Sequence, residues 1–388
     1  MDIPTYDGNY FSKKSLLSTN AVNRQLRDLG PLVYLSKQEV FAVARYDDVR
    51  EALRADETLV NGHGISVNNF LNTRPSYTVL VSDGEVHKRR RAVLMESLGR
   101  PQINELRDRV EQAADDLVID LLNRDGFCAV KDFASHLPVK VVTDLVGLPP
   151  EGREQMLDWA AATFQMIGPM NARAAKSIPR IQGMQKYIQT VAYAHMTPGG
   201  WAARTQDAVS EGRISADEGR AMLIDFIAPS LDTTILAAAH MFWELARNPE
   251  AYEALRADPD LVPSAVNEAV RMSSPIRGFT RSAETGWNIE GSILPVDARL
   301  FVLWSSANHD ERHYEDPETF TVERNPRDHL GWGFGSHFCA GAHLARLEME
   351  QLLYALCRHA QRLELKGPPI PIVNNILQGF ATMPARLN

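Results

Sequence analysis

The feature that most constrains the fold of this chain is one long helical pattern in its second half. The pattern begins with a capping box from Ser215 to Glu218 and stops at Asn248-Pro249. A helix from Ala216 to Arg247 would be about 48 Å long at 1.5 Å per residue, enough to cross a whole domain. Pro229 lies in its middle and removes one backbone hydrogen bond, so we expect a kink there. Because broken rules in a regular helix often mark functional sites, the segment around Pro229 is a candidate site.

The rest of the chain is mainly helical, with short strands before and after the helical part. Helical spacing predominates from Glu85 to Arg271, and the β-rich runs Leu32–Leu35 and Val40–Ala44 favour a hairpin. After Pro275 the pattern predicts short strands at 279–283, 287–291 and 299–303. No repeat, low-complexity tract or linker divides the sequence. We therefore expect one domain over residues 1–388, mainly α with small β-sheets.

Composition narrows the class of protein. The chain has 388 residues, 44% of them hydrophobic and 23% charged, which is typical of a globular protein. Its formal net charge of -8 argues against a nucleic-acid-binding surface. The three cysteines are too few for a disulfide framework, and the first residues lack a secretory signal. The apolar stretch Met222–Trp243 is interrupted by charged residues and a proline, so we expect a cytoplasmic protein with no membrane span.

A glycine-rich segment from Trp332 to Gly341 carries the cysteine best placed for chemistry. It reads Trp-Gly-Phe-Gly-Ser-His-Phe-Cys-Ala-Gly and precedes a helical pattern from about Ala342 to Arg358. Glycines let the backbone turn tightly and approach a flat ligand. Cys339 stands just before a helix N-terminus, where the dipole and free amides favour a thiolate, the form that binds metals. Taken alone, a cysteine packed in a loop is the simpler interpretation.

Four segments in order resemble the motifs of the haem-thiolate monooxygenases, the cytochromes P450. Trp332, Gly335, Cys339 and Gly341 occupy the places of Phe-x-x-Gly-x-x-x-Cys-x-Gly, with tryptophan for phenylalanine. The other three matches are the Glu-x-x-Arg motif, the oxygen-activating helix and the His-x-x-x-Arg motif, at Glu268–Arg271, Leu231–Thr234 and His87–Arg91. The resemblance implies the P450 fold, a triangular prism with haem b between the long central helix and the cysteine-loop helix. It also implies that Cys339 is the iron ligand.

For the haem itself, the resemblance implies a cluster of positive side chains. His87 and Arg91 are one helical turn apart and would bind a haem propionate together. Arg281 and His337 would complete this cluster. The intervening residues Lys88 to Arg90 would face solvent or dock an acidic electron donor.

Two further pairs have implied roles, one structural and one catalytic. Glu268 and Arg271 are three residues apart and would lock the scaffold behind the haem. Asp232 and Thr233 resemble the acid–alcohol pair that delivers protons when the family activates oxygen. Thr233 could also bond back to the carbonyl of Pro229. Pro229-Ser230 stands where relatives commonly carry Ala-Gly.

The resemblance extends to partners and substrate. A separate ferredoxin or flavodoxin with its reductase would supply electrons, and O2 would supply the oxygen atom for hydroxylation or O-demethylation. Several stretches are similar to bacterial P450s that oxidise para-substituted aromatic acids, among them Phe164–Pro169 and Ser306–Asn308. The similarity suggests a compact apolar pocket lined by Phe164, Ile167, Ala228, Ile276 and Phe279. Each of these residues could equally be part of the core.

The expected carboxylate anchor is absent from this pattern. Where that group is expected to carry an arginine and serines, this chain has the segment His63–Asn69 and the pair Ile224-Asp225. His63, Asn68 or Asn69 could hydrogen-bond a carboxylate, a phenol or a ketone, whereas an inward Asp225 would repel an anion. We therefore expect a small aromatic substrate, and we expect a neutral one to bind better than the matching benzoate.

Two other kinds of protein are compatible with parts of the sequence. A haem-binding sensor would use the same cysteine loop without turnover, but it would not need Asp232 and Thr233. A zinc hydrolase could use His309 and His313, which have the i,i+4 spacing of helical zinc ligands. Within the family, an enzyme driven by peroxide is a third alternative.

Overall fold

The long helical pattern forms two helices in the computed structural model, which describes residues 2–192 and 194–388. Helix α12 (Ala216–Ile227) and helix α13 (Asp232–Arg247) are separated by residues 228–231, so the expected kink at Pro229 is a complete break. The capping box forms as predicted, because the Ser215 side chain accepts from the Glu218 amide and the Glu218 carboxylate accepts from the Ser215 amide. The C-terminal stop is also confirmed: Asn248 caps α13, and Pro249 begins α14 (Pro249–Ala257).

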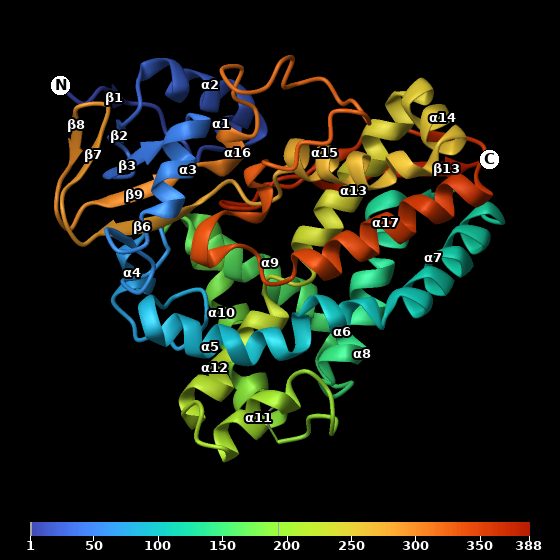
Figure 1. Ribbon diagram of the computed structural model, residues 1–388, viewed down its shortest axis with the longest axis horizontal. Coiled ribbons are helices and arrows are strands. Elements are labelled where there is room, and N and C mark those ends of the chain that lie inside the picture. Colours follow the sequence, from blue (N-terminus) through green and yellow to red (C-terminus); the bar gives the residue numbers. More distant parts are fainter. Residues whose placement is uncertain (1, 193) are drawn as a thin grey trace.

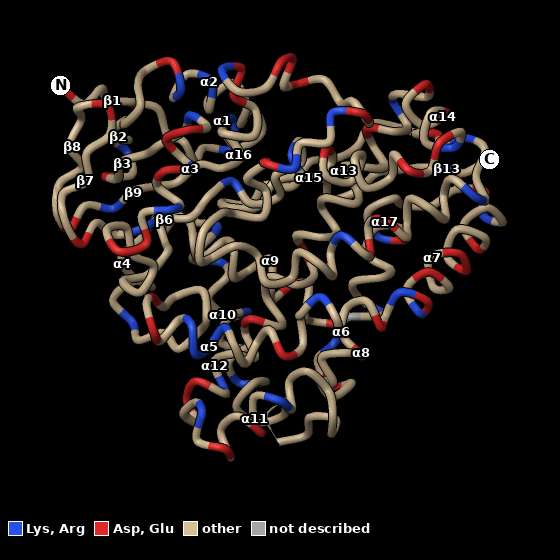
Figure 2. Tube along the Cα trace, viewed as in Figure 1, with Lys and Arg blue, Asp and Glu red and all other residues tan. Residues whose placement is uncertain are grey.

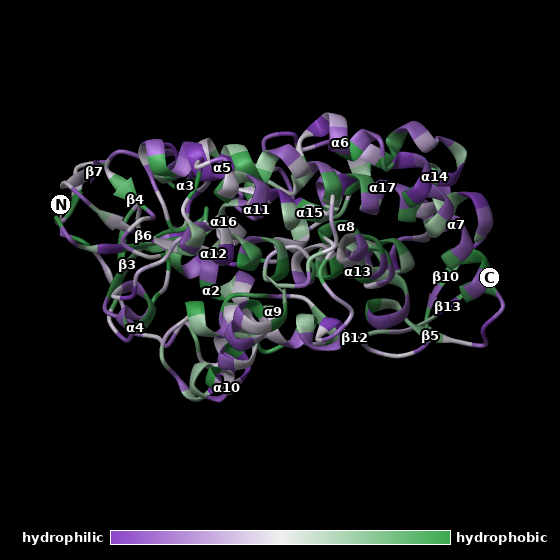
Figure 3. Cartoon of the chain, turned by 90° about the horizontal axis from the view of Figure 1, so that it is seen from below, coloured by the Kyte–Doolittle hydropathy of each residue, from purple (hydrophilic) through white to green (hydrophobic). Residues whose placement is uncertain are grey.

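The other α-helices surround this pair. They are α1 (Lys13–Leu17), α2 (Thr19–Leu29), α3 (Tyr46–Arg54), α4 (Asn69–Asn72), α5 (Gly84–Leu98), α6 (Arg100–Asn104), α7 (Arg107–Leu122), α8 (Thr143–Val146), α9 (Met156–Ile167), α10 (Ala172–Tyr187), α11 (Ala203–Ser210), α15 (Val262–Ser273), α16 (Trp304–Ala307) and α17 (Ala342–His359). Helix α13 packs against α9, α15 and α17, and α17 also packs along α7. In Figure 1 the molecule has a triangular outline that narrows toward α11. Figure 3 shows that it is flatter in the perpendicular direction. This shape agrees with the expected prism.

The strands form small sheets at opposite ends of the molecule (Figures 1 and 3). Near the N-terminus a six-stranded sheet has the order β1-β2-β3-β9-β6-β4. Its strands are β1 (Thr5–Tyr6), β2 (Val33–Leu35), β3 (Val40–Val43), β9 (Arg299–Val302), β6 (Phe279–Ala283) and β4 (Leu59–Val60). Near the C-terminus β10 (Leu363–Leu365), β13 (Pro384–Leu387) and β5 (Phe127–Cys128) form a three-stranded sheet. Two hairpins complete the set: β7 (Trp287–Ile289) with β8 (Ser292–Leu294), and β11 (Ile370–Pro371) with β12 (Phe380–Thr382).

Strand register confirms most of the sequence expectations. The β2–β3 hairpin is antiparallel, with Tyr34 opposite Phe41. Strand β6 has the predicted bounds and pairs antiparallel with β9, so Arg281 lies opposite Leu300. The run at 287–291 is shorter than expected because Glu290 and Gly291, both with positive φ, turn the chain into β8. The organisation as one domain over residues 1–388 stays a prediction.

The interior is apolar, and the charged residues lie mostly on the outside. Both signs of charge are interspersed around the periphery in Figure 2. By length and composition, the 216–247 segment is the one stretch among the described residues that could cross a membrane, but 61% of its most apolar window is buried inside the protein. Burial of this kind is typical of a central core helix, and Ala238 and Phe242 are fully buried.

Candidate active site

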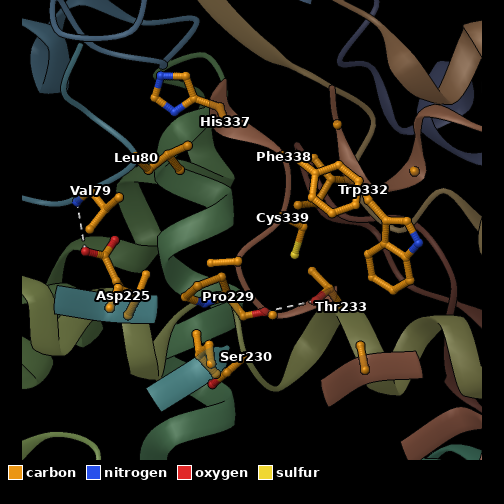
Figure 4. A pocket seen from close by; sticks show the side chains of 18 of the residues that line it. Val79, Leu80, Asp225, Pro229, Ser230, Thr233, Trp332, His337, Phe338 and Cys339 are labelled. Carbon is orange, nitrogen blue, oxygen red and sulfur yellow. Dashed lines mark hydrogen bonds between the residues drawn. The ribbon is translucent and has the colours of Figure 1, made fainter. Parts of the chain in front are cut away.

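A large cavity lies between the α12–α13 break and the cysteine loop. Its volume is about 250 Å³. Figure 4 shows Asp225 and Val79 on one side of the labelled residues and Cys339, Phe338 and Trp332 on the other, with Pro229 between them and Thr233 below Cys339. The elements that contribute lining residues are α5, α12, α13, β6, α17 and the cysteine loop. The break in the long helix therefore forms part of the cavity wall, as its unusual sequence suggested.

The cysteine loop owes its shape to two glycines. Gly333 and Gly335 have φ values of 71° and 76°, a left-handed conformation that side chains rarely adopt. A Cβ on Gly335 would also lie 2.7 Å from the Leu53 carbonyl oxygen. The loop is closed by a hydrogen bond from the Cys339 amide to the Trp332 carbonyl, with N···O 2.8 Å. Helix α17 starts at Ala342, so the cysteine is presented at a helix N-terminus as expected.

The environment of the Cys339 sulfur has opposing effects on its charge. Burial raises the pKa of the thiol, while hydrogen bonds from the Gly341 and Ala342 amides and the charges of Arg91 and Arg346 lower it. A metal ion needs a deprotonated thiol, and binding of the metal supplies the energy to release the proton. The sulfur is thus surrounded by groups that would stabilise a metal-bound thiolate.

The four residues expected to bind propionates all line the same cavity. The imidazole rings of His87 and His337 are 4.2 Å apart between centroids. Arg91 donates to the Phe338 carbonyl at 2.6 Å, and Arg281 donates to the Ala52 carbonyl at 3.0 Å. The structure therefore brings these positive or protonatable groups together, as the motifs implied.

This cluster has spare capacity for an anionic ligand. The Nε2 atom of His87 is buried and has no hydrogen-bond partner. Burial, together with the charges of His337 and Arg91, lowers the pKa of His87 to about 4. Carboxylates would satisfy such a cluster, because they accept several hydrogen bonds and offset its charge. A cysteine sulfur and a group of carboxylate-binding side chains around one cavity fit the iron and the propionates of haem.

Glu268 and Arg271 form a fully buried ion pair behind the cysteine loop. Both N–H···O distances between their side chains are 2.8 Å. Arg271 also donates to the Asn308 carbonyl at 2.6 Å, and Arg324 donates to Glu268 at 3.0 Å. The pair lies on α15, where a Cβ on Gly331 would lie 2.8 Å from a Val270 methyl carbon. Helix α15, which carries the ion pair, thus contacts the chain just before the cysteine loop.

Thr233 and Asp232 lie at the start of α13, in different environments. The Thr233 hydroxyl lines the cavity and donates to the Pro229 carbonyl at 2.9 Å, which is the backbone bond considered as an alternative above. Ser230 makes the same kind of bond to the Phe226 carbonyl. Asp232 does not line the cavity; its Oδ2 atom is buried without a partner, and burial together with Asp158 raises its pKa to about 7. The pair combines a hydroxyl in the cavity with a carboxyl that can exchange protons near neutral pH.

Three of the residues expected in the substrate pocket line the cavity: Asp225, Ile276 and Phe279. The Asp225 carboxylate accepts a hydrogen bond from the Val79 amide at 2.9 Å. Burial raises the pKa of Asp225 to about 7, against the opposing effects of the Val79 and Leu80 amides and of Arg90. The rings of Phe279 and Trp304, which also lines the cavity, meet edge to face with centroids 5.3 Å apart.

The other expected pocket residues lie outside the cavity lining. Phe164 and Ile167 are buried in the core between α9 and the six-stranded sheet, although the Phe164 ring stacks 6.5 Å from Phe279. Asn68 caps α4 and donates to the carbonyls of Met166 and Gly168. Because its hydrogen bonds are used in this way, it does not reach the cavity.

His63, Ile224 and Ala228 are likewise placed outside the cavity lining. His63 is exposed and pairs with Glu284, with N···O 3.2 Å. Ile224 packs against the main hydrophobic core, and Ala228 is buried. The break in the long helix changes which faces of it turn inward, so a single helical period does not identify the lining residues.

Glu348 lines the cavity and was not identified from the sequence. It is 1% exposed, neither carboxylate oxygen has a hydrogen-bond partner, and burial raises its pKa to about 8. One signal could have revealed it: Glu348 is a glutamate whose helical neighbours Leu344, Ala345 and Leu352 are apolar and buried. A charged residue on an apolar helix face is an exception that requires a reason.

The two histidines considered as zinc ligands do not converge. His309 contacts Glu318 at 3.0 Å and the Met272 carbonyl at 2.9 Å. His313 stacks on the Tyr46 ring, and its Nε2 lies 2.7 Å from Asp328. Within residues 2–192 and 194–388, no group of three or more His, Cys, Asp or Glu side chains could hold a metal ion. The structure therefore gives no support to a zinc hydrolase.

Comparison with known proteins agrees with the geometry. The family model "Cytochrome P450" matches residues 19–149 and 202–386. Cytochrome P450 CYP199A2 of Rhodopseudomonas palustris is 34% identical, over 93% of this chain and 89% of the relative. The β-dihydromenaquinone-9 ω-hydroxylase of Mycobacterium tuberculosis is 29% identical, over 90% and 72%.

Solved structures of low sequence identity have the same fold. P450BioI, in complex with an acyl carrier protein carrying hexadec-9Z-enoic acid, superposes with a TM-score of 0.85 at 22% identity, over 97% of this chain and 100% of that one. CYP109E1 of Bacillus megaterium, in complex with testosterone, gives 0.87 at 21% identity, over the same shares. Because the family model matches most of the chain and the cysteine loop lines a cavity suited to haem, the chain belongs to the cytochrome P450 family and is a haem-binding monooxygenase.

Proposed function

We propose that this monooxygenase inserts one oxygen atom from O2 into a small aromatic substrate that carries no negative charge, by hydroxylation or O-demethylation. The observation that carries the proposal is the composition of the cavity wall. Phe226, Ile276, Phe279 and Trp304 supply apolar and aromatic surface, and Asp225 supplies a carboxyl group on the wall away from Cys339. Apolar walls with a few placed polar groups are typical of small-molecule sites.

Different residues of the chain would bind different parts of the cofactor. The Cys339 sulfur would bind the iron, and His87, Arg91, Arg281 and His337 would bind the propionates. When bound, haem supplies the activation of O2, with two electrons and two protons consumed for each oxygen atom inserted and one water released. Electrons would come from a ferredoxin or flavodoxin with its reductase, as the family resemblance implies.

Proton delivery is assigned to the break between α12 and α13. The Asp232 carboxyl has a pKa near neutral pH and a buried oxygen without a partner, so it can both take up and release a proton. The Thr233 hydroxyl faces the cavity and, while donating to the Pro229 carbonyl, can still accept a hydrogen bond.

Asp225 is the reason to propose a substrate without a negative charge. A carboxylate buried beside another carboxylate loses solvation and gains no attraction. A benzoate would lose this solvation energy next to Asp225 on the cavity wall, whereas an anisole or a phenol would not. The mostly buried 216–247 segment supports a cytoplasmic enzyme without a membrane span.

A haem spectrum and a substrate titration test the proposal. The purified holoenzyme should give the long-wavelength Soret band of thiolate-ligated haem when reduced under carbon monoxide, and the Cys339→Ser variant should lose it. Para-methylanisole should shift the resting haem toward high spin and be oxidised with a donor ferredoxin and reductase. A spin shift without any product would favour a haem sensor. A histidine-type spectrum in the fresh enzyme would contradict the assignment of Cys339.

A further inference from the structure

Asp225 is a carboxyl group on the cavity wall without a positive partner. It lies on α12 beside Phe226 and across the cavity from Cys339 (Figure 4). Its Oδ2 atom accepts a hydrogen bond from the Val79 amide at 2.9 Å. Among the described residues, no lysine, arginine or histidine nitrogen forms an ion pair with it within 4.0 Å. Buried carboxyl groups are ordinarily paired, so this one is an exception.

Arg90 of α5, whose charge acts on Asp225, is committed to other acceptors. Its Nε donates to Glu218 at 2.8 Å and its Nη1 donates to the Thr78 carbonyl at 3.2 Å. Glu218 also accepts two hydrogen bonds from Arg89, at 2.9 and 2.7 Å. Arg89 and Arg90 therefore hold the start of α12 and the loop before α5, so neither is a free docking residue. Arg90 contributes a distant positive charge to Asp225 but no hydrogen bond.

The Asp225 carboxylate can accept more hydrogen bonds than the protein gives it. An ionised carboxylate has about four lone-pair sites, and the Val79 and Leu80 amides use only part of that capacity. The remaining capacity faces a cavity whose other walls are largely apolar. A ligand atom that donates an N–H or O–H would satisfy it, and hydrogen bonds to charged groups are the strong ones.

We propose that Asp225 is a specificity-determining residue that binds a hydrogen-bond donor, a hydroxyl or a protonated amine, on the aromatic substrate. The inference rests on the proposed function and adds to it the polar group that the substrate carries. With its donor at Asp225, the ring lies along the apolar wall of Ile276 and Phe279, and its far end points toward the Cys339 side of the cavity. The position opposite the donor is then the one that is oxidised.

A purely structural role for Asp225 predicts a different result. Through the Val79 amide, Asp225 also fixes the loop before α5, and loss of that bond would weaken binding of every ligand equally. Glu218→Gln is a matched control, because it loosens the same loop through Arg90 without changing a cavity residue. Specific recognition requires that only donor-bearing ligands respond to changes at Asp225.

The experiment compares four para-substituted ligands by spin-state titration of the holoenzyme at pH 8. Para-methylanisole has no donor, para-methoxyphenol has a hydroxyl, para-methoxybenzylamine has an ammonium group, and para-methoxybenzoate has a carboxylate. In the wild type, the phenol or the amine should bind at least about 10-fold tighter than para-methylanisole. Asp225→Leu should bring this ratio to about one, and Asp225→Asn should retain part of it. Glu218→Gln should leave the ratio unchanged, even if all affinities fall.

The arms of the experiment separate the outcomes. Preference for the amine over the phenol identifies a cationic substrate, and the reverse identifies a phenolic one. Equal binding of para-methylanisole and both donors in the wild type would overturn the inference, as would an equal loss for all ligands in Asp225→Leu. An amine that binds the iron directly, seen as a low-spin shift, would overturn the amine arm. If the thiolate spectrum and the response to para-methylanisole are intact, these failures leave the proposed function standing.

Discussion

Replacing Glu268 with glutamine should destabilise the enzyme strongly, although the two side chains have the same shape. The Glu268 carboxylate accepts from Arg271 twice at 2.8 Å, from Arg324 at 3.0 Å and from the Thr321 amide at 3.4 Å. In the variant, an amide NH2 would face guanidinium donors, and the charge of the fully buried Arg271 would lose its closest partner. Removing one partner of a buried ion pair costs about 3–5 kcal/mol, a large part of the 5–15 kcal/mol typical of a folded domain.

Two variants show whether the unpaired charge is the cause. Arg324→Gln removes a more exposed member of the cluster and should cost only about 1–2 kcal/mol. The double variant Glu268→Leu with Arg271→Met removes both buried charges and should be less destabilised than Glu268→Gln. The assay is urea unfolding of the holoenzyme, followed by tryptophan fluorescence and by the Soret band. A cost below about 1 kcal/mol for Glu268→Gln, or a double variant as unstable as the single one, would refute the reasoning.

Three other predictions concern titratable or hydroxyl groups in the cavity wall or next to it in the chain. Thr233→Ala should retain substrate binding but divert reducing equivalents to hydrogen peroxide. Asp232→Asn should slow turnover by about 10²- to 10⁴-fold. If both variants keep the wild-type rate and the wild-type yield of product per electron pair, this proton path is excluded. The pKa of Asp225 is about 7, so binding of para-methoxybenzoate should weaken by about 10-fold as the pH rises from 6 to 8, and titrations of Asp225→Asn should show no such trend. Burial raises the pKa of Glu348 to about 8, above the value of about 4.5 in the unfolded chain. The native state therefore binds this proton more tightly than the unfolded state does, and the free energy of unfolding should fall as the pH rises from about 4.5 to 8. Glu348→Gln should remove this loss of stability, which amounts to a few kcal/mol over the whole pH range. The same dependence of the unfolding midpoint on pH in both proteins would contradict the role given to Glu348.

The sequence was sufficient for the parts of the site that depend on local geometry. Cys339 before a helix, the i,i+4 pair His87 and Arg91, and the i,i+3 pair Glu268 and Arg271 are fixed by spacing within a helix or a short loop. Such spacing determines which side chains share a face before any tertiary contact forms. The capping box at Ser215 and a distortion of the helix at Pro229 were predictable for the same reason, although the structure has a complete break where a kink was expected.

The cavity wall was less predictable because it depends on how distant segments meet. Phe164, Ile167 and Asn68 lie near the cavity, but packing between α9, α4 and the six-stranded sheet uses their side chains. The contact between Val79 and Asp225 joins positions 146 residues apart, and nothing in either local sequence indicates it. Thr233 had two possible partners, and only the conformation of residues 228–231 decides that its hydroxyl donates to Pro229 in this structure.

Helix α5 serves the cofactor with one face and the substrate wall with another. His87 and Arg91 line the cavity among the residues expected to bind the haem propionates. Arg89 and Arg90 donate hydrogen bonds to Glu218 of α12, and Arg90 also donates to the loop that contacts Asp225. If binding at one face changes affinity at the other, the coupling is reciprocal. Any factor by which bound haem raises the affinity for substrate is then also the factor by which bound substrate raises the affinity for haem. Variants with substitutions around Asp225 can therefore be ranked by how well they retain haem, with substrate present, against a competing haem-binding protein. This ranking needs no assay of product.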